Sequence, residues 1–458
     1  MEECDEKKQV KKIKDDVLKI ALPVLVELFL GTLFGMIDMM MLGRIKNPQI
    51  AAASIAAVGI TNQPLFIGLS LVQALNVGGT AMVARYVGSK KYDRIETVIK
   101  HVVLLNLVLL VIPLFIFGMV FTEKIMAFLG AEQDAIQVGH NYFKVVMIGF
   151  IFQAFNLSIS AVLRGIGDTK TPMKINLKAN MVNVIGNALL IYGLLGFPKL
   201  GVTGAGISTC LSQIIASIFL GRYILKTDSV VKVNLKNPFK YDKNIIYNLI
   251  KIGVPASLEQ IAFRVGVLLF VKMVASLGTV AFATHQICLN ILGLSFTPGQ
   301  AFGIAASSLV GKSLGANELY EAENYIKQSR KIGSIISTTM AVLFFFFGAQ
   351  IVSLYTQDPE IIKSASTILK VIAFVQPFQS SQLIIAGGLR GAGDTVWTLV
   401  ATFVGVLILR VLFAYLFVNV LEMGLIGAWI AMFVDQFARW VVIYIRFGTG
   451  KWKYISIR

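Results

Sequence analysis

Residues 163–173 read Leu-Arg-Gly-Ile-Gly-Asp-Thr-Lys-Thr-Pro-Met, and residues 389–399 read Leu-Arg-Gly-Ala-Gly-Asp-Thr-Val-Trp-Thr-Leu. Each stretch closes one long apolar segment and opens the next, and the two copies lie 226 positions apart. Glycine admits backbone angles that other residues avoid, and Asp and Thr are typical of helix starts. The repeated phrase therefore predicts a tight turn between two membrane helices, present once in each half of a duplicated chain.

The composition is that of a polytopic membrane protein. Of the 458 residues, 56% are hydrophobic and only 15% are charged, and the mean hydropathy is +0.74. A soluble chain of this length would need more charge to cover its surface. The net charge of +17 does not indicate nucleic-acid binding, because the charges lie in the gaps between apolar runs. No secretory signal pattern precedes the first apolar segment, so we expect that segment to remain as a helix.

Twelve apolar segments are long enough to cross a bilayer, which takes about 20 residues each. The sequence therefore predicts an all-α membrane protein with twelve transmembrane helices. The segments are 17–42, 51–84, 99–121, 139–163, 175–196, 204–225, 246–273, 281–310, 332–355, 361–389, 397–419 and 425–447. The lysine-rich stretch 226–245 predicts a cytoplasmic linker between an N-lobe, 1–225, and a C-lobe, 246–458.

Lysine and arginine are concentrated in alternate gaps, which sets the expected orientation. The positive-inside rule places these gaps, and both termini, in the cytoplasm. Because each half holds six segments, both halves enter the membrane from the same side. We expect two six-helix lobes related by a pseudo-two-fold axis along the membrane normal, with a central cavity between them. The cytoplasmic gaps hold Arg85, Lys90, Lys91, Arg94, Lys170, Lys174, Lys312, Lys327, Arg330 and Lys331.

Besides Asp435, three acids lie within the apolar segments, where an ionised carboxylate costs about 2.5–3.5 kcal/mol on insertion scales. Glu27 and Asp38 are eleven residues apart, so they share a helix face at roughly 16 Å. Asp38 is interpreted as a cation or proton site, or alternatively as an interfacial acid. A structural role fits Glu27 at least as well as a functional one. Glu259, which repeats Glu27 at an offset of 232, is either functional or paired with Arg264.

Polar stripes follow several of the predicted helices. One comprises Asn176, Asn180, Asn183 and Asn187, and another comprises Gln286, Asn290, Thr297 and Gln300. Such stripes must face water or another helix. Helix-helix contacts would explain one stripe, whereas several together favour a water-filled cavity.

The remaining polar residues suggest no catalysis. Arg410 and Arg439 are expected to snorkel or to pair internally, Arg439 with Asp435 one turn earlier. His285 is expected to be a hydrogen-bonded structural histidine. Cys4, Cys210 and Cys288 are too scattered for a disulfide framework or a metal site. Hydrolytic and nucleotide-binding motifs are missing from the sequence, so we expect neither an enzyme nor a cofactor.

Taken in order, several motifs resemble the multidrug and toxic compound extrusion family over residues 17–447. The resemblance implies a twelve-helix, two-lobe secondary antiporter that expels amphipathic, often cationic compounds in exchange for protons or sodium. The motifs are the two repeated turns, Ile37-Asp38 with Met41-Leu42-Gly43, Ala283-Thr284-His285-Gln286-Ile287 and Leu309-Val310-Gly311-Lys312-Ser313-Leu314-Gly315.

The resemblance also assigns roles to single positions. Asp38 matches the aspartate of the N-lobe cation site, and Glu259 matches the glutamate of the C-lobe site in the sodium-coupled branch. Two positions depart from the pattern. Gln379 stands where that branch has an aspartate, and Asn187, four residues after Asn183, stands where many members have one. Thr209 would complete the N-lobe group.

We therefore predict a multidrug efflux antiporter in the plasma membrane, driven by protons or sodium, with protons favoured and Asp38 as the main coupling group. Glu259 would supply a second anionic site. We expect small-molecule substrates, a lipid bilayer, a monomer, no nucleic acid and no structural metal. Substrate would contact Gln73, Asn180, Gln286, Asn290, Gln300 and Gln379. The alternative is a lipid-linked oligosaccharide flippase of the same superfamily, and a channel or membrane-embedded enzyme is a more distant one.

Overall fold

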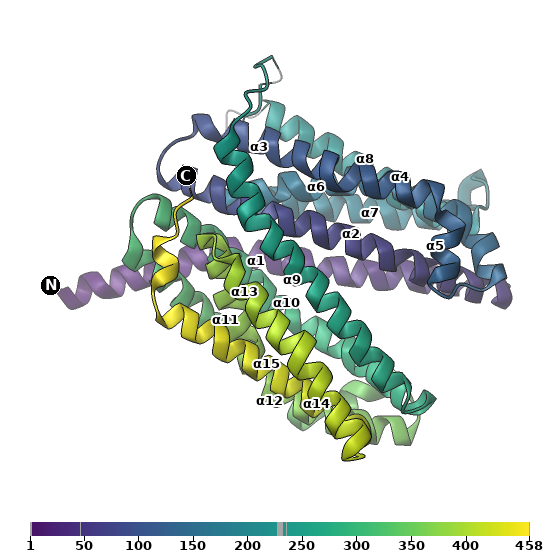
Figure 1. Cartoon of the computed structure of the whole chain (residues 1–458). Helices are drawn as coiled ribbons and strands as arrows, with labels where there is room; N and C mark the ends of the chain where they lie inside the picture. Colours follow the sequence, from purple (N-terminus) through teal and green to yellow (C-terminus); the bar gives the residue numbers. More distant parts are fainter. Residues whose placement is uncertain (1, 46, 227–231, 235, 458) are drawn as a thin grey trace. The chain divides into compact units, whose positions relative to one another are not determined.

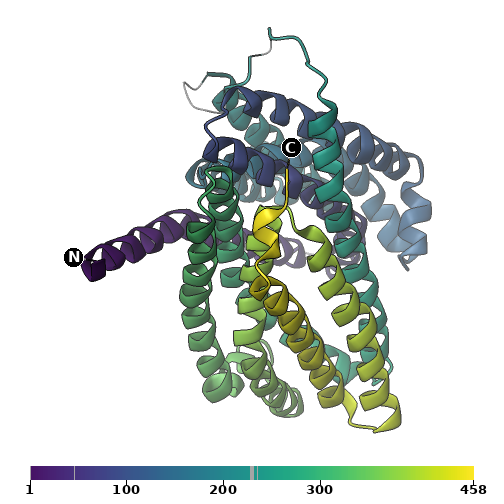
Figure 2. The same cartoon turned by 60° about the vertical axis from the view of Figure 1, so that its left-hand side comes forward.

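A computed structural model describes residues 2–45, 47–226, 232–234 and 236–457 of the chain. Every regular element within these residues is a helix, as Figures 1 and 2 show from two directions. In the first half the elements are α1 (Glu2–Gly43), α2 (Pro48–Gly88), α3 (Asp93–Asn106), η1 (Leu107–Val111), α4 (Ile112–Val120), α5 (Thr122–Phe128), α6 (Gln133–Gly165), α7 (Lys170–Tyr192), η2 (Leu194–Gly196) and α8 (Gly201–Lys226).

The second half repeats this order of long helices. Its elements are α9 (Lys243–Ala275), α10 (Thr279–Gly315), α11 (Leu319–Ser353), α12 (Pro359–Ala392), α13 (Thr395–Thr402), η3 (Phe403–Arg410), α14 (Val411–Tyr415), η4 (Leu416–Val420), α15 (Gly424–Gly448) and η5 (Lys451–Tyr454).

The twelve predicted membrane segments all fall on these helices, and the chain is a multi-pass membrane protein. Ten helical stretches of the described residues are long and apolar enough to cross a bilayer. The other two predicted crossings correspond to α7 and α9. The helix α7 is less apolar than the others because it carries Lys170, Lys174 and Lys178 as well as its asparagines.

The described residues form two compact units. The first-half unit comprises residues 26–86 and 91–250, and the second-half unit comprises residues 2–25, 87–90 and 251–457. The helix α1 therefore contributes its beginning to one unit and its end to the other. The linker predicted at 226–245 includes residues 227–231 and 235, which lie outside the described residues.

Each unit has its own apolar core. In the first-half unit, α6 and α7 both pack against α8, and buried side chains such as Phe143 and Phe150 fill the interior. In the second-half unit, α12 packs against α10, α11 and α15. The beginning of α1 joins this unit through Ile13 and Val17, which pack into the same cluster as Phe302.

The repeated turns have the structure that the sequence predicts, and the two glycines of each copy have different tasks. Gly167 and Gly393 adopt left-handed φ angles of 92° and 87°, which favour glycine. The preceding glycine allows two helices to approach closely. A Cβ on Gly165 would lie 2.9 Å from the carbonyl oxygen of Thr80, and one on Gly391 would clash with the backbone of α10.

The aspartate of each turn then fixes the turn to its unit. Asp168 accepts hydrogen bonds from the Thr171 amide at 3.1 Å and from the Tyr223 hydroxyl at 2.9 Å. Asp394 accepts one from Arg446 Nε at 2.7 Å. Burial raises the pKa of the Asp394 carboxyl above its ordinary value, and the Arg446 guanidinium opposes that rise.

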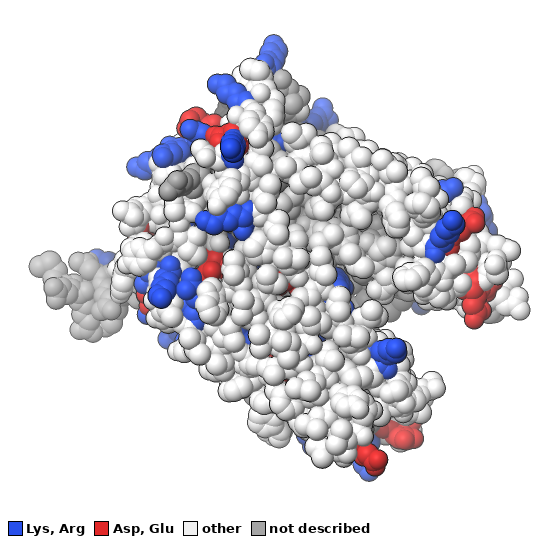
Figure 3. Space-filling model, viewed as in Figure 1, with Lys and Arg blue, Asp and Glu red and all other residues white. Residues whose placement is uncertain are grey.

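Charged side chains gather at the ends of the helices. In Figure 3 the long sides of the helices are almost free of colour, whereas Lys and Arg gather near the start of α3 and near the C-terminus. This distribution is expected of helices whose middle parts contact hydrocarbon.

Candidate functional site

The first-half unit gathers polar side chains around the carboxylate of Asp38. Asp38 is half-buried near the end of α1. Asn187 of α7, which is 1% exposed, donates from Nδ2 to Asp38 Oδ1 at 2.7 Å. We assign the Asn183 amide with its nitrogen toward Asp38, because it then donates to both carboxylate oxygens at 3.0 Å. In this orientation its oxygen accepts from Thr209 Oγ1 at 3.1 Å.

Helical spacing explains how these groups meet. Asn183 and Asn187 are four residues apart, so both side chains project from the same face of α7. Thr209 lies on α8, which packs directly against α7. The two helices approach closely at Gly186, where a Cβ would lie 2.7 Å from Ser208 Oγ. The four residues that the sequence grouped together, Asp38, Asn183, Asn187 and Thr209, are thus neighbours, whereas their role stays a prediction.

The carboxylate of Asp38 accepts hydrogen bonds from neutral side chains only, and none of the described residues supplies a cation to balance its charge. It forms no ion pair with any Lys, Arg or His in the part of the chain that the structure describes. Neutral amides that donate to a carboxylate stabilise its charge without cancelling it. This carboxylate is therefore available to take up a proton or to attract a cationic ligand.

Glu27, on the same helix, has a different environment. Arg164 of the first repeated turn donates to Glu27 Oε1 at 2.8 Å, and Asn176 donates to the same oxygen at 2.6 Å. The ion pair joins α1 to α6 and α7. Of the two interpretations of Glu27, the geometry favours the structural one.

Glu259 repeats the arrangement of Glu27 in the second-half unit. Arg390 of the second repeated turn donates to Glu259 Oε1 at 2.5 Å, and Thr398 donates to Oε2 at 2.8 Å. Thr402 adds a bond of 3.3 Å to Oε1. Glu259 is 5% exposed. The ion-pair partner suggested by the sequence, Arg264, is wrong, because the turn brings Arg390 to Glu259 instead.

The residues predicted to line a cavity differ in their exposure. Four of them are exposed polar side chains on apolar helices, namely Gln73, Gln286, Asn290 and Gln300. Asn180 is half-buried. Gln379, in contrast, is 1% exposed, and neither of its amide atoms has a hydrogen-bond partner among the described residues. Gln379 therefore lies inside the second-half unit and not on a lining surface.

Another buried charge cluster lies in the second-half unit. Asp435 of α15 accepts from Arg439 Nε at 2.9 Å, as the sequence predicted, and also from Arg410 Nε at 3.0 Å. The second arginine could not be predicted, because 25 residues separate it from Asp435. His285 lies among the rings of Phe270 and Trp429. Its ring nitrogens have no hydrogen-bond partner in the described chain, so the expectation of a hydrogen-bonded histidine was wrong.

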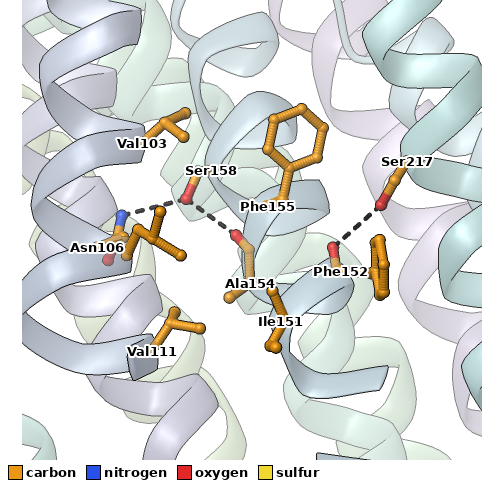
Figure 4. A pocket seen from close by; sticks show the side chains of 10 residues that line it. Val103, Asn106, Val111, Ile151, Phe152, Ala154, Phe155, Ser158 and Ser217 are labelled. Carbon is orange, nitrogen blue, oxygen red and sulfur yellow. Dashed lines mark hydrogen bonds between the residues drawn. The ribbon is translucent and has the colours of Figure 1, made fainter. Parts of the chain in front are cut away.

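A pocket of about 330 Å³ opens in the first-half unit between α3, η1, α6 and α8 (Figure 4). Apolar side chains such as Val103, Val111 and Phe155 form most of its wall. Asn106 donates to Ser158 Oγ at 3.1 Å at one side. None of the residues predicted to contact substrate lines this pocket.

The sequence of this chain is similar to a protein-family profile and to several curated proteins. The MatE family profile matches residues 23–189 and 255–416, one stretch in each half. The "Probable multidrug resistance protein NorM" of Thermotoga maritima is 29% identical over 447 residues, which cover 98% of this chain and 95% of that protein. The "Uncharacterized transporter YisQ" of Bacillus subtilis is 28% identical, covering 94% of this chain and 93% of that protein.

Solved structures share the fold. One is described as the outward-facing conformation of a multidrug resistance MATE family transporter of the MOP superfamily. It matches with a TM-score of 0.86 at 24% identity and covers 96% of this chain and 97% of that one. A crystal structure of MATE in the bent conformation matches with a TM-score of 0.87 at 22% identity, covering 96% and 98%.

Proposed function

This chain belongs to the MatE family of membrane transporters, and on that basis we propose that it exports amphipathic, often cationic, drug-like compounds in exchange for protons. Several curated relatives, that of Thermotoga maritima among them, bear the names of multidrug resistance proteins, which favours drug export over the flipping of lipid-linked sugars. The proposal places the transporter in the plasma membrane with both termini in the cytoplasm.

The observation that carries the proposal is the unpaired carboxylate of Asp38 among amide donors. When ionised, it attracts a cationic substrate from the cytoplasm. Protonation from outside removes the charge and weakens the hold on that substrate, which then leaves outward. Asn183 and Asn187 can solvate both forms, because an amide both donates and accepts. Proton and substrate thus compete for one negative charge.

One observation favours protons over sodium. In the second-half unit, Glu259 is already neutralised by Arg390, and Gln379 supplies no carboxylate. Glu259 would have to release Arg390 before it could hold a cation, so we assign coupling to Asp38 first.

Each unit carries exposed polar side chains on an apolar helix. Gln73 on α2 and Gln286, Asn290 and Gln300 on α10 are exposed although their helices are apolar. Polar groups of this kind face water or protein and avoid lipid. We infer that these residues contact the substrate as it passes.

The test is transport of a cationic dye by the purified protein in liposomes, with the pH gradient and the sodium gradient imposed separately. We expect dye movement with the pH gradient alone, and we expect Asp38→Asn to abolish it. The matched control is Asp15→Asn, which makes the same chemical change at an exposed position of the same helix. Wild-type transport by Asp38→Asn would refute the role of Asp38, and dye movement only with sodium would refute proton coupling.

A further inference from the structure

The buried cluster of Arg410, Asp435 and Arg439, here called the arginine pair site, has an excess of positive charge. These side chains are 2%, 0% and 5% exposed. The two guanidiniums donate four hydrogen bonds to the Asp435 carboxylate, two from each arginine. Two charges of +1 and one of −1 leave a net charge of +1. None of the described residues places a second carboxylate within ion-pair distance of either arginine.

The excess charge is not satisfied by other hydrogen bonds. Two guanidiniums carry ten N–H donors. In the described chain, neither Nη1 group of the pair makes a hydrogen bond. Removing an uncompensated ion from water is costly unless a partner of opposite charge is present. The nearby Phe270 ring, 5.6 Å from the Arg410 guanidinium, offers a cation–π contact and no charge.

Two other buried donors of the second-half unit, linked to Arg410 through the Phe270 ring, also lack partners. His285 is fully buried, and one of its ring nitrogens carries a proton in any protonation state. Its ring lies 5.7 Å from Phe270 and 5.4 Å from Trp429, measured between ring centroids. Trp429 is 1% exposed, and its indole N–H likewise has no acceptor among the described residues. The second-half unit therefore buries hydrogen-bond donors without acceptors as well as an arginine pair site without a full counter-charge.

The repeat shows that the fold does not require these charges. Aligning Gly201 and Gly204 of α8 with Gly424 and Gly427 of α15 places Ser212 at the position of Asp435 and Ala216 at that of Arg439. At the offset of 232 that aligns Glu27 with Glu259, Phe270 stands where the first half has Asp38. The second half thus places an arginine beside the position at which the first half holds its carboxylate. The sign of the local charge is reversed between the repeats.

We propose that the arginine pair site binds one small monovalent anionic group, held by the free N–H groups of Arg410 and Arg439 and assisted by His285 or Trp429. The group is either a free inorganic anion such as chloride or a carboxylate carried by a transported molecule. It supplies the missing negative charge, so that the occupied site is neutral.

The experiment is thermal unfolding of the purified protein in detergent, at fixed ionic strength and fixed sodium concentration. Chloride is exchanged in steps for the bulky sulfonate MES, which carries no carboxylate, in one arm, and acetate is exchanged for the same sulfonate in the other. We expect a saturable rise in the unfolding temperature of roughly 3 °C in at least one arm. A response to chloride alone identifies an inorganic anion, and a response to acetate identifies a carboxylate. An unfolding temperature that is independent of the anion in both arms overturns the proposal.

Variants that change the site charge in opposite directions make the test specific. Asp435→Asn raises the charge from +1 to +2, so we expect a less stable protein with a larger anion response. Arg439→Gln lowers it to zero, and we expect the response to vanish. Arg410→Gln also lowers the site charge to zero, and it replaces Arg439→Gln in the test if that variant does not fold. The matched control is Arg446→Gln, from the one-to-one pair with Asp394, and it should keep the wild-type response. An undiminished anion response in both arginine variants of the site would overturn the proposal.

Discussion

At the scale of single residues, the carboxylates of Asp38 and Glu259 differ in whether a positively charged donor binds them. Asp38 receives neutral amides, whereas Glu259 receives a guanidinium and two hydroxyls. The sequence shows that both acids lie in apolar segments and that Asn183 and Asn187 share a helix face. It does not show that Arg390 reaches Glu259, because 131 residues separate them and only the packed helices bring them together.

The ion pair of Glu259 and Arg390 gives a prediction about stability. Arg390→Gln leaves a buried carboxylate without its counter-charge, and we expect a loss of about 3–5 kcal/mol in the free energy of unfolding. The double variant Glu259→Gln with Arg390→Gln leaves no charge behind, so it should recover most of that loss. Denaturant or thermal unfolding of the single and double variants measures the difference. Equal losses in the two proteins would show that charge burial is not the cause.

At the scale of elements, glycine allows α10 and α12 to pack with their backbones almost in contact. A Cβ on Gly387 would clash with the backbone of Gly303, and a Cβ on Gly303 would lie 2.9 Å from the carbonyl oxygen of Leu383. Small residues at such crossings are typical of membrane helices, where close backbone contact replaces the hydrophobic effect.

We therefore expect Gly387→Ala to push the two helices apart and to cost about 1–3 kcal/mol of stability. Gly293→Ala is the matched control, because Gly293 is an exposed glycine of α10 at which an added Cβ would meet no described atom within 4 Å. Thermal unfolding in detergent compares the two variants with the wild type. The explanation fails if the two alanines have the same effect.

Hydropathy predicts the apolar middle of each membrane helix but not its polar ends. The twelve apolar segments fall on the long helical stretches of the described residues, because each stretch is long and mostly apolar. They missed the polar ends: α1 begins at Glu2 and α11 at Leu319, well before the predicted 17 and 332, since a helix can continue beyond the hydrocarbon. The π-helical stretches η1, η3 and η4 leave no sequence signal of this kind. One of them, η3, ends at Arg410 and so positions a residue whose partner the sequence did not reveal.

At the scale of the whole molecule, the placement of positive charge predicts the orientation in the membrane. We replace Cys4 with serine and add one cysteine, either Leu195→Cys in η2 or Lys240→Cys before α9, both at exposed positions. A membrane-impermeant thiol reagent should label Leu195→Cys in intact cells and Lys240→Cys only after permeabilisation, because lysine-rich segments stay inside. The reverse pattern would place both termini outside.

The proposed exchange also has an electrical signature. One monocation leaving for one proton entering moves no net charge. A membrane potential of about 100 mV would otherwise contribute about 2.3 kcal/mol per charge. We therefore expect a potassium diffusion potential in liposomes to leave the rate of monocationic dye exchange unchanged while a pH gradient drives it. Dye movement driven by voltage at equal pH would contradict this stoichiometry.

The division of α1 between the two units has a consequence for how the polypeptide can be made. Residues 2–25 complete a core whose other members come from the second half of the chain. If the gene were cut within the segment that joins the halves, the amino-terminal fragment would contain residues 2–25, which pack in the core of the unit formed by the carboxy-terminal fragment. Coexpressed fragments would then recognise each other through that piece, and complementation between them would depend on its being present.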